Sequence, residues 1–101
     1  MYFVGSAQDD LAAFPIEARR IAGFELWQVQ RGLMPSDFKP MHGVGPGAYE
    51  VRIHAAGEWR VIYVAKLKDA VYVLHAFGKK TQKTPQADID LAARRYKQLR
   101  G

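Results

Sequence analysis

The stretch Tyr49-Glu-Val-Arg-Ile-His54 alternates apolar with charged or polar side chains, which is typical of a strand with one buried face. Residues 55–58 are a short hairpin connection, after which Trp59-Arg-Val-Ile-Tyr-Val-Ala65 is apolar at nearly every position. We therefore expect both faces of this second strand to be covered. After Lys68-Asp69 the chain enters a third apolar strand, Val71-Tyr-Val-Leu-His-Ala-Phe77. The three runs predict an antiparallel meander with its most apolar strand in the middle.

Two helices are predicted before the meander, preceded by a short strand at Tyr2–Val4. Ser6 followed three residues later by Asp9 has the form of a capping box that opens a short helix. Pro15 ends this helix and suits the first turn of a second one, which Gly32 ends. Apolar residues recur at helical spacing in the second helix and predict a face that packs on the sheet: Ala18, Ala22, Leu26 and Val29, beside Ile16, Phe24 and Trp27.

The rest of the chain is predicted to hold one loop and one helix. Residues 33–48 contain three glycines and three prolines, which favours a loop. The run Gly43-Val-Gly-Pro-Gly47 leads into a strand, whereas phosphate-binding glycine loops lead into a helix. Thr84-Pro85 supplies an N-cap and a first-turn proline for a C-terminal helix, whose apolar face is Ile89, Ala92, Tyr96 and Leu99. The fold class is α+β: a helical hairpin packed on a small, mainly antiparallel twisted sheet, with a C-terminal helix.

Length and composition indicate one small domain. The chain has 101 residues, enough for a single domain over residues 1–101 with one modest core. It has no cysteine, which excludes a disulfide framework and a thiol nucleophile and favours a reducing compartment. Without a long apolar run or a signal-peptide pattern, we expect a cytoplasmic protein with no membrane partner. Three scattered histidines form no metal-ligand pattern, and we expect no cofactor.

The positive charge is concentrated near the C-terminus. The net charge is +5, yet residues 1–78 hold equal numbers of basic and acidic residues. From Lys79 onward there are seven basic residues against only Asp88 and Asp90. This excess is either a surface that faces phosphates or an ordinary solvated helix face, where the helix dipole favours late cations.

Arg60 is the most informative residue for function, because a guanidinium in an apolar central strand is costly to bury without a partner. If the hairpin pairs near register, Arg52 lies beside Arg60 on one face of the sheet. Lys79-Lys80 follow the third strand, so three or four cations converge there. Glu50 lies on the same face and can neutralise part of the charge, but one carboxylate cannot neutralise four cations.

The histidines offer weaker candidates. His42, in the glycine-proline loop, and His54, near the hairpin, are either acid–base groups with a suitable pKa or ordinary solvated side chains. His75 alternates with Val71, Val73 and Phe77, which favours a core histidine.

The order of elements and several motifs resemble a known family. The motifs are Lys39-Pro-Met41, Tyr49-Glu-Val-Arg52, Trp59-Arg-Val-Ile-Tyr63, Val71-Tyr-Val-Leu-His-Ala-Phe77 and Lys79-Lys-Thr-Gln-Lys-Thr84. In this order and spacing they are similar to toxins of the RelE/ParE superfamily, in the phage-derived HigB-like branch. The resemblance covers nearly the whole chain. It implies a RelE-like fold and a type II toxin–antitoxin toxin: a metal-independent endoribonuclease that cleaves mRNA on the ribosome and inhibits translation until a cognate antitoxin, often a helix-turn-helix protein, neutralises it.

The resemblance also implies roles for individual residues. Arg52 matches a basic residue at the scissile phosphate, Arg60 matches the arginine that stabilises the transition state, and Lys80 matches a basic residue that supports the leaving group. The chain departs from the family where Glu50 replaces a lysine and where a C-terminal tyrosine falls near Gln86. Glu50, His54 and His42 are therefore the candidates for moving the proton. The residues expected to contact RNA are Lys39, His42, Lys79 and Lys83.

Two other functions are compatible with the same resemblance. ParE toxins use this fold to poison DNA gyrase without cutting RNA, although the basic residues Arg52, Arg60 and Lys80 argue against this function here. A toxin fold without activity can also serve only as a binding module for its antitoxin. The three functions predict translation arrest, DNA damage and harmless expression, respectively.

Overall fold

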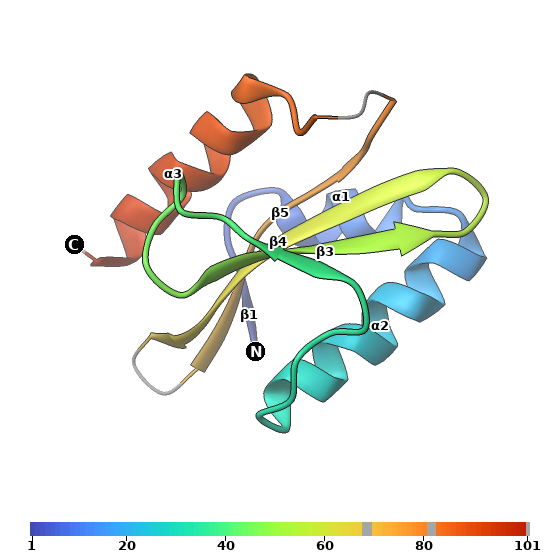
Figure 1. The fold of residues 1–101 in the computed structure, drawn as a ribbon, viewed down its shortest axis with the longest axis horizontal. Coiled ribbons are helices and arrows are strands. Elements are labelled where there is room, and N and C mark those ends of the chain that lie inside the picture. The colour runs from blue at the N-terminus through green and yellow to red at the C-terminus, as the bar shows by residue number, and fades with distance from the viewer. Residues whose placement is uncertain (68–69, 81–82, 101) are drawn as a thin grey trace.

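A five-stranded sheet forms the centre of the protein (Figure 1). The computed structural model describes residues 1–67, 70–80 and 83–100. The strands are β1 (Tyr2–Phe3), β2 (Phe38–Pro40), β3 (Ala48–His54), β4 (Glu58–Leu67) and β5 (Ala70–Gly78), in the order β1-β5-β4-β3-β2. Strand β1 pairs with β5 in parallel, and the other neighbours are antiparallel. The predicted meander is present with its most apolar strand, β4, at the centre of the sheet.

The sheet is larger than the sequence predicted, because it gains a strand from the predicted loop. Residues Phe38–Pro40 form β2, which pairs with β3 through Lys39 opposite Glu50. Three residues give no pattern of their own, so this strand is visible only through its pairing. The three-strand meander with one short N-terminal strand is thus corrected to a five-stranded mixed sheet. The predicted turn at Lys68-Asp69 lies outside the described residues.

Helices α1 (Ala7–Ala12) and α2 (Ile16–Gln30) form the predicted pair before the sheet. Pro15 separates them, and α2 ends at Gln30, two residues before Gly32. Gly32 stops the helix as expected, because it takes a positive φ of 84°. The N–H groups of Gly32 and Leu33 then bond the carbonyls of Val29 and Gln28, the pattern of a Schellman motif. The predicted capping box is wrong. The Ser6 hydroxyl donates to Asp10 Oδ2 at 2.7 Å instead of capping α1.

Each face of the sheet has its own apolar cluster, in place of the single core expected from length. Helices α1 and α2 cover one face, where Leu26 and Val29 pack with Val61, Tyr63 and other buried side chains. The predicted stripe of α2 is buried, but its neighbours Ile16, Phe24 and Trp27 are half-exposed on the outer side of the helix. The outward aromatic residues show that the apolar stripe is narrower than the sequence suggested.

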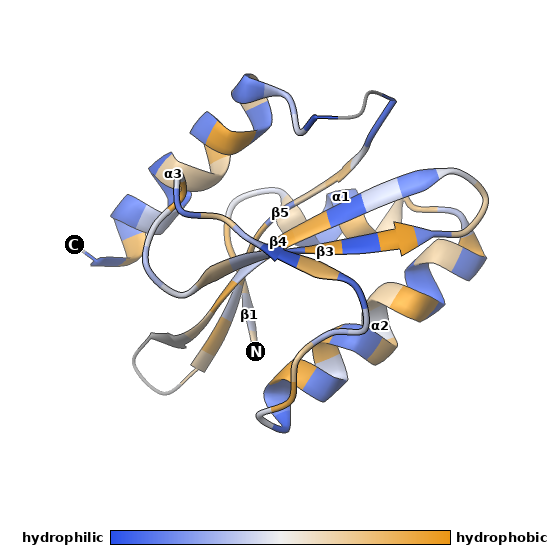
Figure 2. Ribbon diagram, viewed as in Figure 1, coloured by the Kyte–Doolittle hydropathy of each residue, from blue (hydrophilic) through white to orange (hydrophobic). Residues whose placement is uncertain are grey.

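Helix α3 (Gln86–Arg100) covers part of the opposite face (Figure 1). Its Ala92 and Tyr96 are buried against Ile62, Val64 and Leu74 of the sheet, with Ile89 and Leu99 alongside, as the sequence predicted. The loop between β2 and β3 adds Met41 and Val44 to this cluster. Beyond α3, hydrophilic positions interrupt β3 and β4 (Figure 2). This uncovered part of the face carries the residues that the sequence singled out.

No helix in the described ranges is long and apolar enough to cross a membrane.

Candidate functional site

The hairpin between β3 and β4 brings Arg52 and Arg60 together. Their Cα atoms are direct partners across the two strands, with His54 opposite Glu58 two residues away. Because side chains alternate along a strand, Glu50, Arg52 and His54 point to the same face as Arg60 and Ile62. Ile62 packs under α3, so the charged side chains lie beside that helix on the same face. The predicted juxtaposition of Arg52 and Arg60 is therefore confirmed.

Arg60 is buried, and the structure gives its guanidinium three partners. Only 7% of its side chain is exposed. Nη1 donates to the Trp59 carbonyl at 2.9 Å, and Nη1 and Nη2 both donate to Glu58 Oε1 at 3.2 Å. Nε lies 3.7 Å from Glu50 Oε1. Two carboxylates therefore offset the cost of burying this cation, and they hold its position.

Glu50 lies beneath the arginines and is fully buried. Thr84, just before α3, donates its hydroxyl hydrogen to Glu50 Oε2 at 2.6 Å. Glu50 Oε1 accepts no hydrogen bond from the described residues and faces Arg60 Nε. The Thr84 hydroxyl, which the sequence assigned to capping α3, thus ties the start of that helix to the charged site. Glu50 reaches Arg60 but not solvent.

His54 lies between two carboxylates that the sequence analysis did not single out. Its Nε2 is 2.7 Å from Asp37 Oδ2, and its Nδ1 is 2.7 Å from Glu58 Oε2. Asp37 Oδ1 also lies 3.8 Å from Arg52 Nη1. The Asp37 carbonyl accepts a hydrogen bond from the Arg52 N–H at 2.9 Å, just before β2. Asp37 and Glu58 therefore link all three basic side chains of the hairpin.

These contacts set the charge of His54. Hydrogen bonds to Asp37 and then to Glu58 raise the pKa of His54 above its ordinary value near 6.5. The hydrogen bond from His54 likewise lowers the pKa of Glu58, with a smaller contribution from Arg60. A protonated imidazole donates from both nitrogens, which matches a ring held between two carboxylates. The raised pKa therefore favours the protonated, cationic form of His54 in this site.

Lys79, at the end of β5, lies near both arginines. Burial lowers the pKa of Lys79, followed by the charge of Arg60 and smaller effects of Arg52 and Lys39, while Glu50 opposes them. The Lys79 N–H donates to the Glu58 carbonyl at 2.8 Å. Lys79 therefore interacts electrostatically with both arginines. The resemblance assigned the leaving-group role to its neighbour, Lys80.

The other predicted residues lie around this centre. Lys39 is exposed on β2, directly opposite Glu50, and His42 is exposed in the loop that packs against α3. Lys80 and Lys83 are exposed on the connection to α3. His75 is a buried histidine as predicted: its Nε2 lies 2.6 Å from Asp88 Oδ1, and its ring stacks on Phe77. Its Nδ1 has no hydrogen bond to the described residues.

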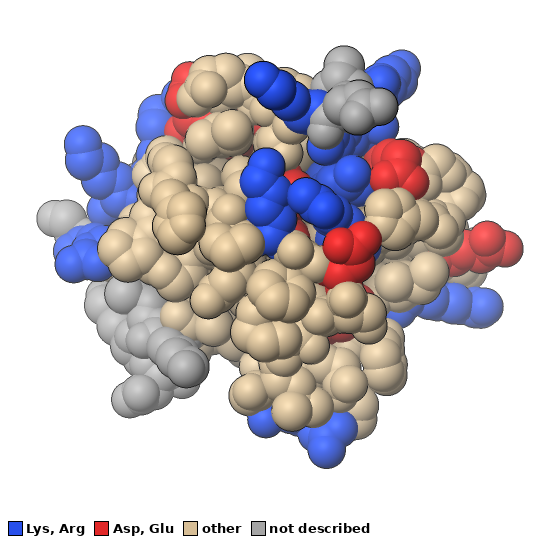
Figure 3. Space-filling view, in the orientation of Figure 1, with Lys and Arg blue, Asp and Glu red and all other residues tan. Residues whose placement is uncertain are grey.

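Lys and Arg side chains gather over the middle of this face, with acidic side chains at their edge (Figure 3). The expectation of a single carboxylate facing four cations is wrong, because Asp37 and Glu58 join Glu50 there. Cationic groups still outnumber carboxylates when His54 is protonated. We call the following residues the arginine cluster: Lys39, Arg52, His54, Arg60 and Lys79 with Asp37, Glu50 and Glu58.

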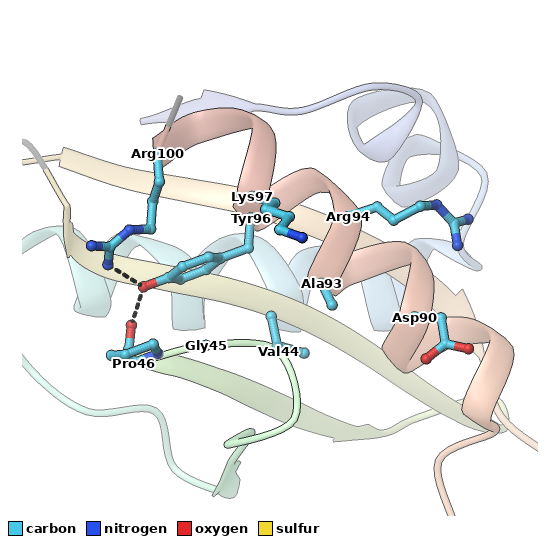
Figure 4. Close-up of a pocket in the computed structure, with 9 residues that line it drawn as sticks. All are labelled: Val44, Gly45, Pro46, Asp90, Ala93, Arg94, Tyr96, Lys97 and Arg100. Carbon is cyan, nitrogen blue, oxygen red and sulfur yellow. Dashed lines mark hydrogen bonds between the residues drawn. The ribbon is translucent and has the colours of Figure 1, made fainter.

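A separate groove lies along α3, away from the arginine cluster (Figure 4). Its volume is about 830 Å³. Tyr96 forms its floor, with its hydroxyl donating to the Pro46 carbonyl at 2.8 Å. The basic side chains at its rim, Arg94, Lys97 and Arg100, come from the C-terminal charge excess but point in different directions in this view. They do not converge as Arg52 and Arg60 do.

The chemistry available at the arginine cluster is recognition of an anion. The guanidinium groups donate several hydrogen bonds in a fixed geometry that suits phosphate oxygens. Within the described ranges, no three His, Asp or Glu residues are placed to hold a metal ion.

Most of the chain matches a known protein family. Residues 9–97 match the family described as "Phage derived protein Gp49-like (DUF891)", and the match includes every residue of the arginine cluster. No curated protein matches the chain. The chain belongs to the Gp49-like family of phage-derived proteins, which is part of the RelE/HigB-like toxin superfamily.

Proposed function

We propose that the protein is the toxin of a type II toxin–antitoxin system in the cytoplasm and cleaves mRNA on the ribosome without a metal. The observation that carries the proposal is the direct pairing of Arg52 with Arg60 on the uncovered part of the sheet. Membership of a toxin-like phage-derived family supports the same function. A HigB-like subtype is part of the proposal.

In this proposal Arg52 and Arg60 bind the scissile phosphate. The ribose 2′-oxygen bonds to phosphorus as the bond from phosphorus to the 5′-oxygen breaks, leaving a 2′,3′-cyclic phosphate and a 5′-hydroxyl. The phosphorane in between carries extra negative charge, which fixed cations stabilise more than they stabilise the substrate. Arg60 is suited to this role because Glu58 and Glu50 already hold its guanidinium in place. Lys79 and Lys80 supply charge near the leaving group, and Lys39 and Lys83 contact the RNA on either side.

Glu50 has a different role in this proposal from the one its sequence position suggested. Its carboxylate is fully buried and accepts the Thr84 hydroxyl hydrogen, so it positions Arg60 instead of meeting the ribose. His42 and His54 remain the candidates for moving the proton. A Gln substitution at each histidine, followed by single-turnover cleavage assays, tests them.

The antitoxin is proposed to cover the arginine cluster, because this both blocks the site and compensates its charge. We expect a 1:1 or 2:2 complex with a partner that places carboxylates against Arg52 and Lys79. Binding of the product of a neighbouring gene tests this, since an Arg52→Glu variant should lose the complex while an Arg20→Glu variant on α2 keeps it. Failure of both neighbouring gene products to bind would contradict the proposal.

The decisive experiment is to induce the wild type and variants separately and to follow growth, translation, DNA synthesis and mRNA ends. Arg60→Ala leaves Glu50 buried without its cation, so loss of folding could mimic loss of activity. Arg52→Ala is the sharper test, since 36% of its side chain is exposed. Arg20→Ala, on the outer part of α2, is the matched control.

We expect translation to stop in the wild type and the Arg20→Ala variant, with new mRNA 5′-hydroxyl ends, and to continue in the Arg52→Ala variant. Cleavage by purified protein with and without ribosomes then tests ribosome dependence. Intact mRNA with blocked DNA synthesis would support gyrase poisoning. Normal growth with a folded wild-type protein would support the inactive binding module.

A further inference from the structure

Four side chains of the β3–β4 hairpin and Asp37, which precedes β2, form one continuous chain of charge contacts. Asp37 lies 3.8 Å from Arg52 and 2.7 Å from His54. Glu58 lies 2.7 Å from His54 and 3.2 Å from Arg60. Each carboxylate therefore bridges an arginine and the same imidazole. His54 has 53% of its side chain exposed and sits between the two bridges.

The two carboxylates compete with any anion that binds the arginines. Nη1 and Nη2 of Arg60 both donate to Glu58 Oε1, so Glu58 engages one hydrogen of each nitrogen before a phosphate arrives. When a phosphate accepts the hydrogen bonds of Arg60, Glu58 loses its contact with that cation. In the same way, Asp37 loses its contact with Arg52 when Arg52 binds a phosphate. His54 is already within hydrogen-bond distance of both. A protonated ring satisfies them, whereas a neutral ring donates to only one.

We propose that His54 is a positioning residue that controls how tightly Arg52 and Arg60 bind RNA phosphates, by holding Asp37 and Glu58 when its ring is protonated. The choice of RNA as the ligand rests on the proposed function. The charged groups around His54 are Asp37 before β2, Glu58 on β4, and Arg52 and Arg60 beyond them. None of the sequence-based roles of His54 included this one.

A pH dependence follows from the proposal. The hydrogen bonds from His54 to Asp37 and Glu58 raise its pKa above 6.5. The ring is protonated at pH values below this raised pKa and loses its proton as the pH rises through it. RNA binding is therefore tight at the acidic end and weakens as the ring becomes neutral. The expected loss is about three- to tenfold, the size that two exposed ion pairs support.

The test is binding of a fluorescent 2′-O-methyl RNA oligonucleotide, which lacks the attacking hydroxyl, to the full chain from pH 6.0 to 8.5 at constant ionic strength. We expect His54→Gln to bind weakly at all pH values, with a flat profile. Arg20→Gln, an exposed substitution on α2 outside the arginine cluster, should follow the wild type. The Asp37→Asn/Glu58→Gln double variant should bind tightly with a flat profile. Circular dichroism confirms that each variant is folded.

A wild-type pH profile retained in His54→Gln, or a flat profile in the wild type, would overturn the inference. Sulfate binding separates this inference from the proposed function, because sulfate is a dianion that does not titrate between pH 6.0 and 8.5. Its affinity is measured from the NMR signals of the Arg52 and Arg60 backbone amides. If sulfate affinity depends on His54 and pH but RNA binding is insensitive to Arg52→Ala, the proposed function fails and the role of His54 stands. If Arg52→Ala weakens RNA binding but His54→Gln leaves it unchanged, only the inference about His54 fails.

Discussion

At the scale of single residues, the site is built around the cost of burying Arg60. A buried guanidinium persists only when its partners remain charged and well placed. Glu58 contributes hydrogen bonds from the exposed side, while Glu50 faces Nε from below. Glu50 is itself buried and depends on the Thr84 hydroxyl. The position of Arg60 is therefore coupled to the segment that begins α3.

Replacing Thr84 with valine tests this coupling. The change keeps the shape of the side chain but removes the donor to Glu50 Oε2, leaving a buried carboxylate oxygen without its partner. We expect a loss of about 1–3 kcal/mol in the free energy of unfolding, measured by urea denaturation at pH 7. Ser6→Ala removes a hydroxyl that bonds Asp10 at an exposed position and should cost clearly less. Equal losses in the two variants would contradict the role of Thr84.

Part of this site follows from sequence because hairpin register is a local property. Alternation in β3 and the short turn place Arg52 beside Arg60, and the same register puts Glu58 opposite His54. Asp37 could not be found in this way. It reaches His54 because β2, which directly follows Asp37, pairs with β3 through only three residues. These residues lie in a segment, residues 33–48, whose three glycines and three prolines favour a loop. A contact that depends on tertiary pairing of so short a strand leaves no periodic signal.

At the scale of elements, helices and long strands were predicted well and the short strand was missed. Helix α2 has a strong stop signal at Gly32, and α3 follows Pro85 as expected. The width of the apolar face of α2 was overestimated, because Ile16, Phe24 and Trp27 lie on the side of the helix that faces away from the sheet. Phe24 and Trp27 instead contact each other, and Arg31 lies over the Trp27 ring at 4.6 Å.

Two glycines with opposite surroundings test the packing of these elements. An added Cβ at Gly23, within α2, meets nothing within 4 Å, so Gly23→Ala should raise the free energy of unfolding by about 0.5–1 kcal/mol through helix propensity. An added Cβ at Gly45 would lie 2.7 Å from the buried Tyr96 ring. Gly45→Ala should therefore cost about 1–3 kcal/mol by displacing that ring from under α3.

Thermal and urea unfolding of the two glycine variants beside the wild type measures both effects. Destabilisation by Gly23→Ala would mean that the exposed side of α2 is packed in solution. An unchanged Gly45→Ala variant would mean that the loop at residues 44–46 does not hold Tyr96.

At the scale of the whole molecule, the fold separates two surfaces. Helices α1 and α2 cover one face of the sheet, and α3 covers only part of the other, leaving the arginine cluster accessible beside it (Figures 1 and 3). The sequence indicated a helical hairpin and a C-terminal helix but not which face each one covers. Handedness and register decide that, and they place the half-exposed aromatic residues of α2 opposite the cations.

This separation predicts that the affinity for RNA depends on charges of the arginine cluster and not on charges of α2. The shortest extent of the chain is 23 Å, whereas the screening length is about 8 Å at physiological ionic strength. Arg52→Gln should therefore weaken binding of the 2′-O-methyl RNA about tenfold or more in 0.15 M salt, because it removes charge-assisted hydrogen bonds to phosphate. Arg20→Gln removes the same charge from α2 and should change the affinity by less than about twofold. At 0.01 M salt, where the screening length grows to about 30 Å, a small effect of Arg20→Gln should emerge. Equal losses for both variants in 0.15 M salt would contradict an interface confined to the arginine cluster. A loss for Arg20→Gln alone would place the RNA on the α2 face, against Phe24 and Trp27.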